Sequence, residues 1–375
     1  MNEPSDAEDA YAMALASFGV SPGRLRTLLR GFTPAEAWQA LAAGRHPGDA
    51  DAALRSKATE DALVRAFRAR AGSPVEVKIL GGRGYPRFLA ADPDPPAVLF
   101  VLGELDGLEN RPRVAVVGTR SATPTGLGIA EEVGASLSSA GVSVVSGLAR
   151  GIDSAAHLGS LRTGGAPAIA VLGTALDATA PPAQLSLRRE VAASGVVLSE
   201  LPPGVAGARW WFAVRNRVMA ALAHVVVVVE AHATGGALHT VRAARRRGVP
   251  VAAVPGSVRS PASAGANALL VEGASPVRHA DDVLDLLGAV VAGLSGVAWP
   301  RRADDATRAR GRTPDPRLSA EELAVRRALD QDPVSLDVVV LRTGMPLGEV
   351  ALALERLADA GQAVEAHGWW ARPHR

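Results

Sequence analysis

The sequence of 375 residues contains no cysteine. This absence excludes disulfide bonds, thiolate metal sites and cysteine nucleophiles. Long apolar runs are missing too: the longest purely aliphatic segment covers residues 225–229, far short of the roughly 20 residues that a membrane span needs. The first ten residues are acidic and lack the apolar stretch of a signal peptide. We therefore expect a soluble, cytoplasmic protein with no membrane partner.

Lysine is nearly absent. Of the 40 basic residues, two are lysine (Lys57 and Lys78) and the remaining 38 are arginine. An arginine side chain pairs with phosphate through two hydrogen bonds and stacks on bases, whereas a lysine ammonium does neither. The net charge is only +2, but residues 200–260 hold eight arginines against Glu200 and Glu230, a local excess of six. This clustering predicts an anionic partner for one region.

Both ends of the chain predict small helical modules. Residues 1–72 are rich in Ala, Leu and Arg, and the pairs Ser21-Pro22 and Thr33-Pro34 resemble helix starts, so we expect a SAM-like helical domain. Residues 291–317 predict a linker because Arg, Asp and Pro dominate without an apolar period. Three predicted helices and a β-hairpin that includes His367 and Gly368 make residues 318–375 a winged helix.

Six short apolar runs mark the middle of the chain, residues 75–290. They cover residues 113–118, 142–146, 168–173, 195–198, 225–230 and 249–254. The runs are continuous and do not alternate with polar residues, as expected for strands that are covered on both faces. Helix-length amphipathic segments separate them. This alternation predicts a Rossmann-like α/β fold with a mostly parallel, doubly wound sheet.

The loops after the predicted strands are the places to look for a site, since ligands of open parallel sheets bind beyond the carboxyl ends of the strands. The first of these loops contains Gly118, Thr119, Arg120 and Ser121. Glycine lets the backbone approach an anion, and the hydroxyl, N–H and guanidinium groups can donate to it. The glycine spacing matches neither a dinucleotide fingerprint nor a P-loop. A plain strand-to-helix turn is the alternative.

The loop after the second run has a similar composition. It contains Ser146, Gly147, Ala149, Arg150 and Gly151. We expect Asp153 to be the N-cap of the helix that follows. His157 lies one turn further, and an ordinary buried or surface histidine is favoured there over a catalytic one.

Three aromatic residues precede a basic segment. Residues 210–212 are Trp, Trp and Phe, and Arg215, Asn216 and Arg217 follow them. Stacking faces beside phosphate-binding forks are the two elements that single-strand binding requires. The alternative places the aromatic rings in the core and Arg217 on the surface as an ordinary charge.

Two further loops complete the predicted edge. Glu230 ends the fifth run, and Gly235, Gly236 and Thr240 open the next helix, which favours anion binding. Glu230 is either a catalytic carboxylate or the partner of a neighbouring arginine. Another turn-rich pair contains Pro255, Gly256 and Asn267.

No Ser-His-Asp spacing, His-rich metal cluster or isolated carboxylate pair stands out in the sequence. We therefore predict no catalytic residue, no metal and no cofactor. The five loops favour phosphate binding and not an enzyme.

In their order along the chain, these motifs resemble the signature of the DprA/Smf family of DNA-processing proteins. The matching segments are residues 118–120, 146–153, 199–204, 215–217, 229–231, 236–240, 254–256 and 265–267, within a resemblance that covers about residues 80–285. The chain departs from the family pattern at Thr125, at Ala180 and at Thr234-Gly235.

The resemblance implies a protein that binds and protects incoming single-stranded DNA during natural transformation. It also implies loading of the RecA recombinase and a homodimer formed through the α/β domain. The phosphate contacts that it implies fall on Arg120, Ser146, Gly147 and residues 215–217.

Two other functions stay open. In a related Rossmann-like group, enzymes cleave nucleoside monophosphates at the glycosidic bond, and Glu230 would assist; the Gly-Thr and spaced glutamate of their motif do not follow Gly236 here. A winged helix could read duplex DNA, but the predicted helix over residues 347–360 has Arg356 as its one basic residue, against three acids. Such a helix repels phosphate, so an interaction or structural role is favoured.

Overall fold

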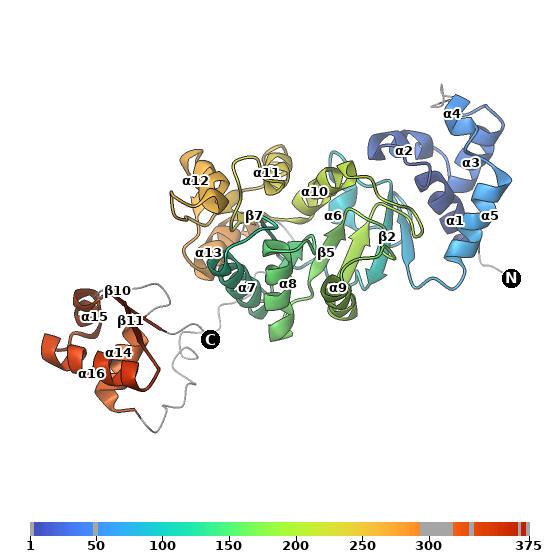
Figure 1. Cartoon of the computed structure of the whole chain (residues 1–375). Coiled ribbons are helices and arrows are strands. Elements are labelled where there is room, and N and C mark those ends of the chain that lie inside the picture. Colours follow the sequence, from blue (N-terminus) through green and yellow to red (C-terminus); the bar gives the residue numbers. More distant parts are fainter. Residues whose placement is uncertain (1–3, 48–51, 293–317, 330–333, 367–368, 373–375) are drawn as a thin grey trace. The chain divides into compact units, whose positions relative to one another are not determined.

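The computed structural model describes residues 4–47, 52–292, 318–329, 334–366 and 369–372 (Figure 1). The chain forms two compact units, residues 1–302 and 303–375. The predicted linker lies outside the described residues from residue 293 onward, as do His367 and Gly368 of the predicted hairpin. The boundary predicted between residues 72 and 75 falls inside the first unit and stays a prediction. None of the described helices is long and apolar enough to cross a membrane.

Short helices form the N-terminal part of the first unit. They are α1 (Pro4–Ala16), α2 (Pro22–Leu29), α3 (Pro34–Ala42), α4 (Ala52–Arg55) and α5 (Glu60–Arg70). The predicted helix starts are confirmed, because Ser21 caps α2 and Thr33 caps α3, the latter in a capping box with Glu36. Their apolar faces share one buried cluster with the strand residues Phe100 and Val197.

A mostly parallel sheet forms the centre of this unit. Its strands are β1 (Glu76–Ile79), β2 (Val98–Gly103), β3 (Arg113–Val117), β4 (Ser143–Ser146), β5 (Ile169–Leu172), β6 (Val196–Ser199), β7 (Val225–Val228), β8 (Val251–Ala253) and β9 (Ser275–Pro276). The order across the sheet is β1-β2-β6-β5-β4-β3-β7-β8-β9. β1 pairs antiparallel with β2 and β2 with β6, whereas the other pairs are parallel.

Each of the six predicted apolar runs overlaps a strand, so the Rossmann-like prediction is confirmed. Three strands, β1, β2 and β9, were not predicted from the sequence. β1 carries Glu76 and Lys78 at the sheet edge, where polar residues are tolerated, and β9 has only two residues, Ser275 and Pro276.

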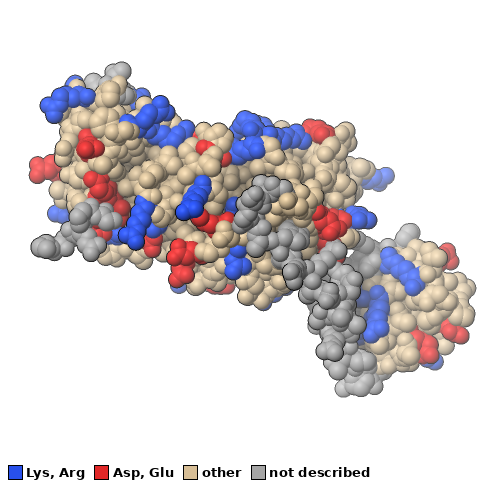
Figure 2. Space-filling model, turned by 180° about the vertical axis from the view of Figure 1, so that it is seen from behind, with Lys and Arg blue, Asp and Glu red and all other residues tan. Residues whose placement is uncertain are grey.

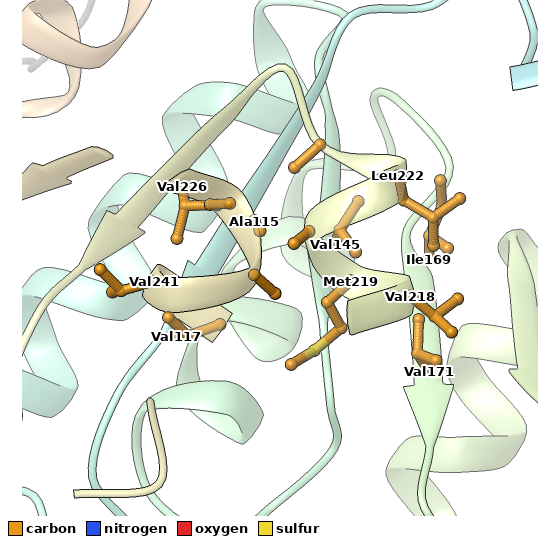
Figure 3. Packing of buried hydrophobic residues seen from close by; sticks show 14 of the residues in the cluster. Ala115, Val117, Val145, Ile169, Val171, Val218, Met219, Leu222, Val226 and Val241 are labelled. Carbon is orange, nitrogen blue, oxygen red and sulfur yellow. The ribbon is translucent and has the colours of Figure 1, made fainter. Parts of the chain in front are cut away.

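Helices cover both faces of the sheet, as a doubly wound fold requires (Figure 1). One face packs against α7 (Pro124–Ser139), α8 (Ile152–Thr163) and α13 (Ala280–Val291), and α9 (Pro182–Ser194) shares a cluster with Ala168, Ala170 and Val197. The other face packs against α6 (Arg87–Ala90), α10 (Trp210–Leu222), α11 (Ala237–Arg245) and α12 (Ala264–Val271), which follows the short 3-10 helix Pro261–Ser263. Figure 3 shows this second core, in which Val218 and Met219 of α10 face Val145 and Val171 of the strands.

The second unit is a winged helix, as predicted. Its elements are α14 (Ala320–Ala328), α15 (Leu336–Thr343), α16 (Leu347–Asp359), β10 (Val334–Ser335), β11 (Val364–Ala366) and β12 (Trp369–Ala371). The three strands form one antiparallel sheet in the order β10-β12-β11. Val325, Leu354 and Leu357 are fully buried in its core.

Candidate functional site

The strand order places a crevice between β3 and β7. From β3 the chain adds β4, β5 and β6 on one side, and it then returns to add β7, β8 and β9 on the other side. Loops that follow β3 and β7 therefore diverge, which is the position where open α/β sheets bind ligands. A pocket of about 440 Å³ lies there, between these two loops and the helices α10 and α11. We call it the switch-point pocket.

Half of the residues predicted for the site line the switch-point pocket. They come from four separate segments of the chain, which the fold brings together at one edge of the sheet. These residues are Gly118, Thr119, Arg120, Ala149, Asp153, Arg215, Asn216, Gly235, Gly236 and Thr240.

Positive charge dominates the lining. Arg120, Arg209 and Arg215 stand against one acid, Asp153, an excess of two charges. Arg120 and Arg209 are exposed and can reach a ligand in solution, whereas Arg215 is 6% exposed. The pocket therefore has an exposed cationic rim that can bind phosphate, above a buried guanidinium.

Asp153 joins two loops beneath the pocket. The expected N-cap role is wrong: Gly151 is the N-cap of α8, and Asp153 is the second residue inside the helix. Its carboxylate accepts backbone hydrogen bonds from Ala149 and Gly118, which ties the loop after β4 to the loop after β3. Burial raises the pKa of this carboxyl, and the nearby charge of Arg215 opposes that shift.

Arg215 is held by several internal partners. It donates to the carbonyl oxygen of Val171 and, at 3.1 Å, to Oδ1 of Asn216, and its Nη2 lies 4.0 Å from the Asp153 carboxylate. Gly147 faces the guanidinium so closely that a Cβ atom there would overlap it. Glycine at 147 is thus explained by close packing on Arg215.

The start of α11 forms the opposite wall, where Gly235, Gly236 and Ala237 line the pocket. The N-cap Gly236 has no capping side chain, and the N–H groups of Leu238 and His239 donate to the backbone, each at 3.1 Å, so the donors that this turn can offer a ligand are the N–H groups of Gly236 and Ala237. Asn216 Nδ2 donates to the Gly236 carbonyl oxygen at 3.2 Å, which fixes this turn against α10. The Thr240 hydroxyl lines the same wall, is fully buried and has no hydrogen-bond partner within the described structure. A helix N-terminus with an unsatisfied hydroxyl suits an anion.

The three aromatic residues separate into two roles. Trp211 is buried and stacks on Trp210 with ring centroids 4.3 Å apart, so the core alternative holds for it. Phe212 lines the pocket, and the Arg120 guanidinium carbon lies 5.0 Å from its ring centroid. Phe212 is therefore the member of the series placed to stack on a ligand.

Ser146 and Arg217 lie beneath the pocket and not in its lining. The buried Ser146 hydroxyl donates to the Val116 carbonyl oxygen at 2.7 Å. Arg217 is 8% exposed; it donates to Glu200 at 2.5 Å and lies 3.2 Å from an Asp94 carboxylate oxygen. Neither alternative that the sequence left open for Arg217, a phosphate contact or a surface charge, describes this buried ion pair.

Glu230 supports the first loop. Its carboxylate accepts the Thr123 backbone N–H at 2.9 Å and the Thr123 hydroxyl at 2.6 Å, while Thr123 caps α7. Of the two roles that the sequence left open for Glu230, the pairing with a neighbouring arginine is therefore replaced by a pairing with a threonine. Glu230 is also outside the lining of the switch-point pocket.

The remaining predicted residues lie around this centre. Ser121 belongs to the first loop but is exposed and does not line the pocket, and Arg150 donates to the Arg120 carbonyl oxygen at 3.2 Å. Gly151 has a φ of 91° and passes so close to Thr119 that a side chain would overlap its carbonyl oxygen. Pro255, Gly256 and Asn267 do not line the pocket; the Asn267 amide closes its own loop by two hydrogen bonds to the Gly256 backbone, each 3.0 Å.

Sequence reasoning did not assign Arg209, Met219, His232 and His239 to the site, although they line the pocket. Arg209 belongs to the basic segment that the sequence singled out, and its place just before the aromatic series is a signal that could have identified it. His232 lies in the predicted loop after Glu230, and His239 lies within the family-like segment 236–240, so both had a local signal as well. Met219 has none, because only the fold brings it to the crevice.

Basic side chains on the face shown in Figure 2 gather in small groups between acidic ones. Several arginines from the basic segment are neutralised internally: besides Arg217, Arg247 pairs with Asp92 at 2.7 Å and Arg245 with Glu272 at 2.7 Å. The position of exposed Arg120 and Arg209 in the pocket is therefore a better indication of anion binding than the number of arginines in the segment.

His157 is an ordinary buried histidine, as favoured from the sequence. It is 0% exposed, and burial lowers its pKa to about 4. Within the described residues, no group of three or more His, Cys, Asp or Glu side chains could hold a metal ion.

These features define a class: a Rossmann-like α/β protein with a cationic, aromatic-walled pocket at its switch point, followed by a winged helix. The model of a family described as DNA recombination-mediator protein A matches residues 76–288, and that of the DprA winged helix domain matches residues 309–365.

Known relatives of the chain include DNA processing proteins as well. Protein Smf of Escherichia coli is 34% identical over 78% of this chain and 75% of its own length. The DNA processing protein DprA of Streptococcus pneumoniae is 42% identical over 53% of this chain and 70% of its own length. The solved structure of the S. pneumoniae protein superposes with a TM-score of 0.63, at 32% identity over 72% of this chain and 95% of that one. The structure of DNA processing protein A of Helicobacter pylori, solved to describe its single-stranded DNA binding mode, superposes with a TM-score of 0.52. The two sequences are 25% identical, and the match covers 59% of this chain and 98% of that one. The chain belongs to the DprA/Smf family of DNA processing proteins.

Proposed function

We propose that this chain binds single-stranded DNA in the switch-point pocket. The observation that carries the proposal is the pairing of exposed Arg120 with Phe212 at the mouth of a crevice that also presents the N-terminus of α11. A phosphate fits against Arg120 and the backbone N–H groups, and a base fits against the aromatic ring. Membership of the family, and the H. pylori relative studied for its single-strand binding, support the same ligand.

The cellular role that we propose follows from the family. The protein protects incoming DNA during natural transformation, loads the RecA recombinase and acts in the cytoplasm as a homodimer formed through the α/β domain. Glycosidic-bond hydrolysis finds no support in the position of Glu230, whose two carboxylate oxygens are occupied by Thr123.

A titration of labelled single-stranded and double-stranded oligonucleotides at two salt concentrations tests the binding. We expect the single strand to bind more tightly and its affinity to fall steeply with salt, because bound cations are released. An unstructured oligonucleotide that fails to bind at low salt would overturn the proposal. Equal affinity for the duplex would show that the pocket does not select the strand.

A further inference from the structure

A second pocket lies next to the first at the same edge of the sheet. It measures about 310 Å³, in the range of roughly 300–1,000 Å³ that is usual for small-molecule sites. Its walls come from residues 147–150 after β4, from residues 172–174 and 178–181 after β5, and from Gln184 and Arg188 of α9. We call it the β5 pocket. Two residues that line only this pocket, Gly147 and Arg150, belong to the DNA-binding residues predicted from the sequence, and the others have no role in the proposed function.

The two pockets share one wall. Arg120, Ala149, Phe212 and Arg215 line both of them. Arg120 is exposed and lies over the Phe212 ring, so a ligand group on either side meets the same guanidinium and the same aromatic ring. Two neighbouring groups of one extended chain could therefore occupy the two pockets, with the phosphate between them at Arg120.

The chemistry of the β5 pocket differs from that of its neighbour. Leu148, Leu172, Ala178, Ala180 and Pro181 give it apolar walls of small and medium side chains. Its lining contains no acid, since Asp153 of the switch-point pocket is not part of it, and the polar groups are the Gln184 amide, the Thr174 and Thr179 hydroxyls and four guanidinium groups. These guanidinium groups belong to Arg120, Arg150, Arg188 and Arg215, so the pocket is more cationic than its neighbour. Apolar walls with a few donors and acceptors suit a planar base, which has apolar faces and a polar edge.

The walls are held in place. Arg188 Nη1 donates to the Ala178 carbonyl oxygen at 3.1 Å and so anchors the loop after β5 to α9. Leu148 has a φ of 53°, a left-handed conformation that is unfavourable for leucine. It is buried in the cluster that contains Leu187 and Val191 of α9, and it lines the pocket together with its neighbours Gly147 and Ala149. Strain of this kind is commonly retained at ligand sites.

We infer that the β5 pocket accepts the base of the nucleotide adjacent to the one held in the switch-point pocket. The inference rests on the proposed function, since it takes the strand as already bound at Arg120. The protein would then bind two consecutive bases, one in each pocket, with the side chains of Phe212 and Arg120 between them.

Two single strands of equal length test this inference. Both contain equal numbers of thymidine and abasic nucleotides, arranged in one strand as a single thymidine block and in the other in strict alternation. Their charge and base count are identical, but only the blocked strand offers two consecutive bases. We expect the intact chain to bind the blocked strand more tightly, by about fivefold or more, since stacking of one base is worth ~1–3 kcal/mol.

Filling the β5 pocket should abolish that difference. Ala180→Tyr places a large ring in the pocket, and Gln184→Trp fills it from α9 if the first variant does not fold. Ala183→Tyr is the matched control, because Ala183 is exposed on the same helix and lines neither pocket. We expect the control to keep the preference for the blocked strand, and both filled variants to bind the two strands equally.

The outcomes separate the two proposals. If the intact chain binds neither strand, the proposed function fails. If it binds both with equal affinity, or if the filled variants keep the preference, the second subsite is overturned and the first remains. Thymidine 5′-monophosphate is the third probe: competition that Ala180→Tyr abolishes, together with equal affinity for the two strands, would make the pocket a site for free nucleotides and overturn the inference.

Discussion

Arginine occurs both on the rim of the switch-point pocket, where it is exposed, and in the layer beneath the rim, where it is buried and paired. Arg120 and Arg209 on the rim are exposed. Arg215 and Arg217, two neighbours on α10, are 6% and 8% exposed and donate to protein groups. An arginine that is already paired and desolvated has little left to offer a phosphate. The rim should therefore decide binding, and the buried layer should decide stability.

The buried layer also explains why the rim has a fixed shape. Asp153 joins the loops after β3 and β4, Arg215 joins α10 to β5, and Asn216 joins α10 to the start of α11. The elements that surround the pocket are thus cross-linked below its floor. Such preorganisation lowers the entropy cost of binding a flexible strand.

The largest effect that we predict is on stability, for Arg217→Ala. The change leaves the Glu200 carboxylate, whose side chain is 9% exposed, without its cation. Removing one member of a buried pair costs about 3–5 kcal/mol. Urea-induced unfolding of the full chain measures the loss, with exposed Arg209→Ala as the control, for which we expect a change within about 0.5 kcal/mol. Equal losses in the two variants would erase the distinction between rim and buried layer.

The second prediction concerns pH and the buried His157. Its pKa is lowered from 6.5 to about 4 by burial, so protons bind preferentially to the unfolded chain. The stability that this neutral histidine allows is complete above pH 6.5 and is lost as the pH falls toward about 4, by ~3 kcal/mol.

Replacing the imidazole with a group that does not titrate should remove this dependence. His157→Met is expected to flatten the curve of unfolding free energy against pH between about 4 and 6.5. The difference between the two proteins isolates His157 from Glu200, whose pKa is raised to about 7 by burial and which acts in the opposite direction. Parallel curves for the two proteins would contradict the assignment.

Local patterns in the sequence were sufficient for most of the fold. Continuous apolar runs identified β3 to β8, and serine or threonine before proline identified the starts of α2 and α3, because these signals arise from neighbouring residues. β1 and β9 were not predicted, because an edge strand with alternating charges and a strand of two residues leave no such pattern. β2 was not predicted either, although its residues do form a continuous apolar run.

The sequence indicated where along the sheet the candidate site lies, but not which of its side chains are buried and paired. The loop motifs indicate the edge of the sheet at which the switch-point pocket lies. Nothing local, however, distinguishes Arg217, which is buried against Glu200 just after β6, from an arginine that meets solvent. The same limit applies to Glu230, whose partner Thr123 lies 107 residues away. Burial and pairing depend on contacts between distant segments, and a single sequence does not reveal them.

The third prediction turns to the rim. Arg120→Ala removes the exposed guanidinium over Phe212, and we expect the dissociation constant for single strands to rise about tenfold, as for a charged hydrogen bond. The loss should be the same for all sequences, and the slope of affinity against salt should decrease by about one. Fluorescence anisotropy measures both, and urea unfolding should show an unchanged stability. A loss of stability that matches the loss of binding would place Arg120 in the buried layer instead.

The smallest effect is expected in the winged helix. Arg356 is the only basic residue of α16, it lies 3.8 Å from Glu322, and the helix also carries exposed Glu349 and Glu355. A surface pair of this kind contributes about 0–1 kcal/mol, and its arginine has an acid beside it that competes with phosphate. Arg356→Ala should therefore change the affinity of the full chain for single or double strands by less than about twofold. A larger loss confined to the duplex would restore the winged helix as a DNA reader, and the contrast between a binding edge and an acidic C-terminal module would no longer hold.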